Sequence, residues 1–147
     1  MNRSILVVLN DAPCSKLALE FLAQCPLSFP GVKITILHVF RKPSGSEEMM
    51  GRKFFKSQKE RVEKAMSNAR QRLIEAGYPP DNVHTHIETQ PYPTVADGII
   101  TEVNKNNHDI VVIGRKNMSK SEEFVMGDAS IKLIRALEEA TVIVVKC

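Results

Sequence analysis

The alternation of short apolar runs with longer amphipathic segments is the feature that most limits how this chain can fold. Five runs rich in Val, Ile and Leu are too short and too β-branched for buried helices, so they are predicted to be strands. These runs cover residues 5–9, 32–40, 83–89, 109–113 and 141–145. The first and the last two are continuous apolar runs, which indicates strands buried on both faces of a parallel sheet.

Helical patterns with three-to-four residue apolar spacing lie between the predicted strands. Thr94 and Asp97 have the spacing of a helix cap, and Gly77 is expected to end the longest helix. The predicted buried stripes are Leu17, Ala18, Phe21, Leu22 and Cys25 in segment 14–25; Phe55, Val62, Met66, Ala69 and Leu73 in segment 46–76; Val95, Ile99, Ile100 and Val103 after Thr94; and Ile131, Ile134 and Leu137, with Leu133 beside them, after Asp128. This alternation predicts one doubly wound α/β domain over residues 1–147.

Composition excludes several classes of protein. The chain has 147 residues, of which 43% are hydrophobic and 25% charged, as in globular domains that need no disulfide framework. No apolar run approaches the roughly 20 residues that span a membrane, and the run after the N-terminus is too short for a signal peptide. The three cysteines are widely spaced and form no Cys-x-x-Cys pair. We therefore expect a cytoplasmic protein with no membrane partner.

The positive charge is concentrated in one segment. Residues 41–72 hold ten basic and four acidic residues, a net charge of +6, so the remainder carries −3 of the overall +3. Trp is absent and aromatic residues make up 5%, which leaves few side chains on which bases could stack. A charged helix face of this kind is typically solvated, so we expect no nucleic-acid partner.

The ends of two predicted strands form the candidate ligand site. Open α/β sheets bind ligands beyond the carboxyl ends of their strands. The first strand is followed by Asn10, and the fourth by Gly114, a polar basic loop and Gly127, after which a helix begins. Such a loop can present backbone N–H groups to a phosphate at the helix N-terminus.

Four pieces of the chain carry a family resemblance: SILVVLN at 4–10, ILHVF at 36–40, HDIVVIG at 108–114 and TVIVVK at 141–146. With them, the whole chain resembles the universal stress protein family. The resemblance implies a doubly wound α/β fold of the adenine-nucleotide alpha-hydrolase-like type, with a five-stranded parallel sheet in the order 3-2-1-4-5 and helices on both faces. That order places the switch point between the first and fourth strands.

Family members that bind ATP carry Gly-x2-Gly-x9-Gly-(Ser/Thr) after the fourth strand and an Asp at the end of the first. By resemblance, Gly114 and Gly127 hold the outer glycine positions, but Asn117 replaces the middle glycine. Asp128 stands where Ser or Thr is expected, and Asn10 replaces the Asp. The resemblance also implies contacts from the hydroxyl of Ser130 and from the backbone near Val39.

These replacements are expected to weaken or abolish ATP binding. An ionised Asp128 can cap the helix and accept the N–H bonds that a phosphate would take. It would also repel a phosphate charge about 4 Å away by ~1–4 kcal/mol. Asn10, a neutral amide, forfeits charge-assisted hydrogen bonding. In the opposite direction, basic loop residues could attract an anion; these are Arg115, Lys116 and Lys120.

Other constellations indicate no catalytic or metal site. His84 and His86 share a strand face but have no evident third ligand, so they are interpreted as edge-strand residues. His38 is expected to be a satisfied core histidine. Cys14 is interpreted as a packing or incidental residue. No Ser-His-Asp arrangement has the order or spacing of a nucleophilic enzyme.

The last predicted strand is expected to form a dimer interface, since the implied order places it at an edge and an apolar edge needs a partner. The interface candidates are Val142, Ile143, Val144 and Val145. The sequence thus predicts a homodimeric regulatory or interaction module of the stress response, with an unidentified protein partner and no assigned catalytic residues. The alternative is an adenine-nucleotide-binding stress sensor, for which ATP or AMP would be the cofactor.

Overall fold

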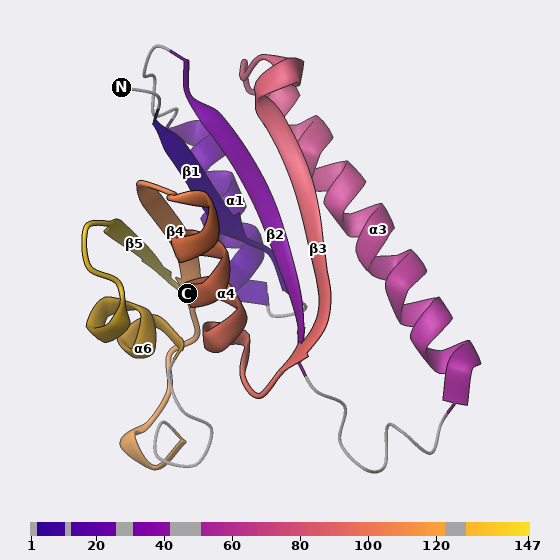
Figure 1. Cartoon of the computed structure of the whole chain (residues 1–147). Helices are drawn as coiled ribbons and strands as arrows, with labels where there is room; N and C mark the ends of the chain where they lie inside the picture. Colours follow the sequence, from indigo (N-terminus) through magenta and orange to yellow (C-terminus); the bar gives the residue numbers. More distant parts are fainter. Residues whose placement is uncertain (1–2, 11–12, 26–30, 42–50, 123–128) are drawn as a thin grey trace.

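A computed structural model describes residues 3–10, 13–25, 31–41, 51–122 and 129–147. Its strands form one parallel sheet in the order β3-β2-β1-β4-β5, which confirms the expected fold (Figure 1). The strands are β1 (Ser4–Val8), β2 (Lys33–Arg41), β3 (Val83–Tyr92), β4 (Ile110–Arg115) and β5 (Thr141–Lys146). Their carboxyl ends lie together at the lower edge of the sheet in Figure 1.

Helices cover both faces of the sheet and create two hydrophobic cores. Helices α1 (Pro13–Gln24) and α3 (Gly51–Glu75) bury one face, and α4 (Val95–Asn106) and α6 (Ala129–Ala136) bury the other. Successive side chains of a strand point to opposite faces, so Ile5 and Val7 enter the first core, whereas Leu6 and Val8 enter the second. This two-sided burial explains why β1 is an uninterrupted apolar run.

Three predicted helix stripes differ from the structure. In α3 the predicted Phe55 is 38% exposed. In α6 the predicted Leu133 is buried, and Leu137, just past the helix end, packs against the second core. Ile134, a predicted member of the stripe, is 58% exposed, and Ser130 is buried instead. In α1, Leu17 is 46% exposed and Cys25 lies exposed beyond the helix end. A short helix with several apolar residues leaves its rotation ambiguous, and contact with the sheet decides it.

Several element ends also differ from the prediction. β3 continues past residue 89 to Tyr92, which pairs with Arg41 after a register shift in β2. Its length includes Pro91, which an edge strand tolerates. Residues 46–50, the predicted start of the long helix, lie outside the described residues. Gly77, at a φ of +112°, follows that helix as expected.

No helix among the described residues is both long and apolar enough to cross a membrane.

Candidate functional site

The candidate site lies where the strand order reverses. β1 pairs with β2 on one side and β4 on the other, so the chain leaves the ends of β1 and β4 in opposite directions. Asn10 follows β1, and Gly114 belongs to the last part of β4. The structure therefore brings two of the predicted site residues to the same edge of the sheet.

Asn10 is held through its main chain by the first turn of α1. The hydroxyl of Ser15 donates to the Asn10 carbonyl at 2.7 Å and accepts from the Asn10 N–H at 3.2 Å. Ser15 is 2% exposed, which makes this link part of the folded core. The Asn10 side chain, a neutral amide, is half-buried at the end of the strand.

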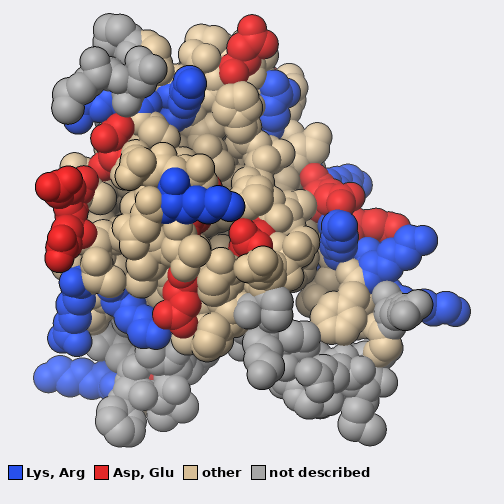
Figure 2. Space-filling model, viewed as in Figure 1, with Lys and Arg blue, Asp and Glu red and all other residues tan. Residues whose placement is uncertain are grey.

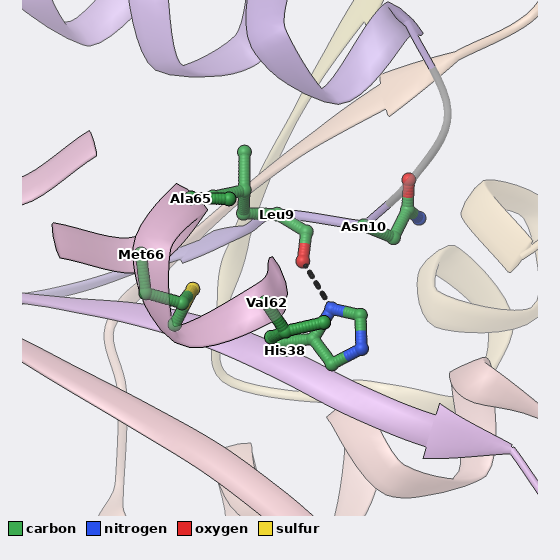
Figure 3. Close-up of a pocket in the computed structure, with 6 residues that line it drawn as sticks. All are labelled: Leu9, Asn10, His38, Val62, Ala65 and Met66. Atoms are coloured by element: carbon green, nitrogen blue, oxygen red, sulfur yellow. Dashed lines mark hydrogen bonds between the residues drawn. The ribbon is translucent and has the colours of Figure 1, made fainter. Parts of the chain in front are cut away.

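A small cavity lies beside Asn10, between the end of β1 and α3. Its lining residues are Leu9, Asn10, His38, Val62, Ala65 and Met66 (Figure 3). His38 is buried, and its Nδ1 lies 2.9 Å from the Leu9 carbonyl, which confirms the expectation of a satisfied core histidine. The cavity measures about 20 Å³. That volume suits a water molecule and is far below the roughly 300 Å³ of a small-molecule site.

Close packing explains why residue 114 is a glycine, without any need for a bound ligand. A Cβ added at this position would overlap the carbonyl of Cys14 and lie 2.9 Å from the Ser15 nitrogen. The end of β4 is therefore pressed against the first turn of α1. A larger residue at position 114 would push apart the two elements that bound the crevice.

Cys14 forms a disulfide with Cys147 at this same point. The interpretation of Cys14 as a packing or incidental residue is therefore wrong, although its side chain is buried, as a packing role implies. The two Cα atoms lie 5.5 Å apart although the residues are 133 positions apart in sequence. Only the topology, which puts the end of β5 beside the start of α1, reveals the pair.

The remaining predicted residues are spread around the crevice. Val39 is buried two positions beyond Leu37, the last β2 residue that pairs with β1. Arg115 is half-buried and pairs through β4 with Lys146, whereas Asn117 is exposed. Ser130 is 3% exposed in the first turn of α6. Gly127 and Asp128 lie outside the described residues, so the predicted phosphate loop is described only in part.

A paired carboxylate lies at the start of α4, near the same edge of the sheet. The Thr94 hydroxyl donates to Asp97 Oδ2 at 2.7 Å, and Lys132 Nζ lies 3.9 Å from Asp97 Oδ1. The Thr94 hydrogen bond, together with the Lys132 charge, holds the pKa of Asp97 below its usual range. Lys132 links α6 to α4 here, and the Asp97 carboxylate already balances its positive charge.

A larger cavity lies at the opposite edge of the sheet. It measures about 320 Å³, and Asn107, His108 and Glu138 are among the residues that line it. These residues precede β4 and β5, so the cavity opens at the amino ends of the strands and lies apart from the crevice.

Comparison with known proteins identifies relatives of this fold. The model of the universal stress protein family matches residues 1–146. A similar solved structure is UspA from Lactobacillus plantarum, with 15% sequence identity, a TM-score of 0.71 and 97% of both chains covered. A universal stress protein family protein from Arabidopsis thaliana with AMP bound has 18% identity and a TM-score of 0.67, over 98% of this chain and 91% of that chain. A universal stress protein in complex with cAMP has 13% identity and a TM-score of 0.67, over 97% of this chain and 95% of that chain. At these identities the likeness concerns the fold. Comparison with curated proteins gave no significant match.

Proposed function

Because the chain belongs to the universal stress protein family, we propose that it is a homodimeric regulatory or interaction module of the stress response whose nucleotide binding is weakened or lost. The observation that carries this proposal is the makeup of the crevice. Asn10 supplies a neutral amide at the end of β1, and its main chain is bonded to Ser15. Gly114 is required for contact with α1, so it is not by itself a sign of a phosphate site.

The second candidate function is an adenine-nucleotide sensor. Two proteins with the same fold contain AMP and cAMP in their solved structures. The chain also keeps a half-buried Arg115 beside Gly114 and a buried Ser130 at the start of α6. In this alternative, Arg115 attracts the phosphate and Ser130 supplies a hydroxyl near it.

Calorimetric titration of ATP, ADP, AMP and cAMP into the unmodified protein separates the two functions. The proposal expects no binding at micromolar nucleotide. The triple variant Asn10→Asp, Asn117→Gly and Asp128→Ser is expected to gain affinity for ATP, because it restores the family pattern. The triple variant leaves the net charge unchanged, because Asn10→Asp adds one carboxylate and Asp128→Ser removes one. Asn68→Asp, on the exposed face of α3, is the control for the single charge that Asn10→Asp adds.

Micromolar affinity in the unmodified protein would replace the proposal with the sensor function. A triple variant that binds no better than the unmodified chain would show that these three positions are not the cause of weak binding.

The proposed dimer uses β5, the strand at one edge of the sheet. The interface candidates Val142, Ile143, Val144 and Val145 are all half-buried within one protomer. An apolar edge strand with remaining exposed surface is an association site unless it is covered. A second β5 strand, related by two-fold symmetry, would cover it.

The proposal includes a cytoplasmic location and a protein partner, but no nucleic acid. Figure 2 shows acidic and basic side chains interleaved on the side of the molecule where α3 lies. For example, Lys59, Glu60, Glu63 and Lys64 are all exposed on this helix. Mixed charge of this kind favours solvation over a phosphate-binding stripe.

A further inference from the structure

A histidine and two carboxylates meet between the edge strand β3 and helix α4. His86 Nε2 lies 3.4 Å from Glu88 Oε2 and 3.9 Å from Glu102 Oε2. One donor atom from each of the three side chains lies within 4.8 Å of the others. His86 and Glu88 are two positions apart on β3, so they share the sheet face that α4 covers.

Each carboxylate has one oxygen fixed by the protein and the other directed at His86. Glu88 Oε1 accepts from the Gln90 N–H at 3.0 Å, which leaves Oε2 beside His86. Glu102 Oε1 accepts from Asn106 Nδ2 at 2.7 Å and lies 3.3 Å from His108 Nε2, which leaves Oε2 on the His86 side. The three donor atoms therefore converge without rearrangement of the groups that hold them.

Glu102, the ligand from α4, is buried, and further buried side chains hold it in place. The Glu102 side chain is 9% exposed and that of His108 is 4% exposed. His108 Nδ1 lies 2.6 Å from the Ser4 hydroxyl at the start of β1, which orients the imidazole. A ligand carboxylate held by a buried histidine and an amide resembles the outer support that metal sites use to orient their ligands.

We propose that His86, Glu88 and Glu102 bind one divalent transition-metal ion, with Zn²⁺ as the typical occupant. Imidazole nitrogen and carboxylate oxygen are both ligands of this class of ion. Tetrahedral coordination with bonds of about 2.0–2.2 Å places donor atoms roughly 3.3–3.6 Å apart. The His86 separations of 3.4 and 3.9 Å are close to that spacing, and side-chain movement must bring the two carboxylate donors, which lie within 4.8 Å of each other, to the same spacing.

The site lies at the edge of the sheet, between β3 and α4, whereas the nucleotide crevice lies at the switch point between β1 and β4. Glu88 pairs with Val39 of β2 and so borders the crevice, but the supporting residues Ser4 and His108 lie at the amino ends of β1 and β4. The His86 side chain is 45% exposed, so an ion can enter from solvent and keep a water molecule as a further ligand. Bound there, the ion would link α4 to the edge strand and stabilise the fold.

The test is calorimetric titration of untagged Cys25→Ser protein with ZnCl2, followed by the visible spectrum of the CoCl2 complex. Removal of the free thiol of Cys25 eliminates a competing ligand. We expect one ion per chain, a higher thermal midpoint with Zn²⁺, and cobalt absorption bands of a nitrogen- and oxygen-ligated ion. His86→Ala and Glu88→Gln are each expected to weaken binding by at least about tenfold, since even outer-sphere losses cost about 10–100-fold.

His84→Ala is the matched control. His84 is exposed on the same strand, two residues from His86, and is not part of the cluster. It should bind zinc as the parent protein does and melt at the same temperature. The proposal is overturned if the parent binds no ion, if His84→Ala loses as much affinity as His86→Ala, or if neither ligand variant changes the affinity.

Discussion

Thr94 shows how one side chain can define the start of a helix. Its hydroxyl accepts the Asp97 N–H at 3.2 Å and donates to Asp97 Oδ2 at 2.7 Å, so Thr94 is the cap of α4 that its spacing predicts. The ionised Asp97 also lies in the first turn, where the helix dipole favours negative charge. Both interactions depend on residues three positions apart, which is why sequence alone predicts them.

Removal of this cap should destabilise the protein. Thr94→Ala is expected to lower the free energy of unfolding at neutral pH by about 0.5–2 kcal/mol. The folded pKa of Asp97 is lowered, so its stabilisation is present above the unfolded value of about 3.9 and is lost as the pH falls through the folded value. The cost of Thr94→Ala should therefore shrink below about pH 4.

Urea denaturation of both proteins at neutral and acidic pH measures this difference. Thr101→Ala is the control, because Thr101 is exposed in the middle of α4 and its hydroxyl only donates back to the Asp97 carbonyl. It should change stability by less than about 0.5 kcal/mol. Equal losses in the two variants would argue against a specific cap at Thr94.

Gly114 offers a second test at a single residue. Gly114→Ala places a methyl group against the Cys14 carbonyl, which is backbone and cannot rotate away. Overpacking of this kind is expected to cost about 1–3 kcal/mol of unfolding free energy. Chemical denaturation measures it, and wild-type stability in Gly114→Ala would mean that β4 and α1 do not meet as closely as the structure shows.

The site residues differ in how far sequence could predict them. Asn10 and Gly114 follow predicted strands, so their common edge could be inferred from topology. The contact of His86 with Glu102 could not, because it joins an edge strand to the buried face of a helix. The sequence signal for this contact is Glu102, a charged residue on the apolar stripe of α4 between Ile99 and Val103.

Among elements, the strands were predicted better than the helix faces. β4 and β5 are continuous apolar runs, so their positions are evident in the sequence. The predicted burial on both faces holds for β4 but is wrong for β5, which is half-buried because it lies at an edge of the sheet. α6 has apolar residues on several sides, so its buried side depends on where the sheet lies. Small polar Ser130 takes a core position there, which hydrophobic periodicity does not predict.

The edge strand β5 is expected to hold the dimer together. Sedimentation at micromolar protein is expected to show a dimer, and Val144→Asp is expected to shift it to the monomer by placing a charge in the interface strand. Gln90→Asp is the matched control because it adds the same charge to β3, the opposite edge. Circular dichroism checks that both variants are folded. A wild-type protein that sediments only as a monomer would exclude the interface.

At the scale of the whole molecule, the strand order explains the one covalent link between distant parts of the chain. Because β4 and β5 follow β1 on the same side of the sheet, the chain end returns to the start of α1. The Cys147 N–H donates to the Arg115 carbonyl at 3.1 Å, and its side chain joins Cys14. The family resemblance implies this strand order, but a separation of 133 residues gives no local signal that the two cysteines pair, so the disulfide was not predicted.

The Cys14–Cys147 disulfide should therefore stabilise the entire fold. Closing a loop of this length restricts the unfolded chain, and its loss is expected to cost about 2–5 kcal/mol. Cys147→Ser should lower the thermal midpoint without reductant, whereas Cys25→Ser, at the exposed free thiol, should not. Reductant should bring the wild type down to the level of Cys147→Ser.

Alkylation of thiols during cell lysis connects this bond to the proposed location. A reducing compartment such as the cytoplasm disfavours a structural disulfide. If the bond forms in the cell, one cysteine reacts with the alkylating agent before reduction and all three react after it. If all three cysteines react before reduction, the disulfide is absent in the cell and β5 is not linked to α1 there. The thermal midpoint measured in reductant would then describe the protein in its cellular state.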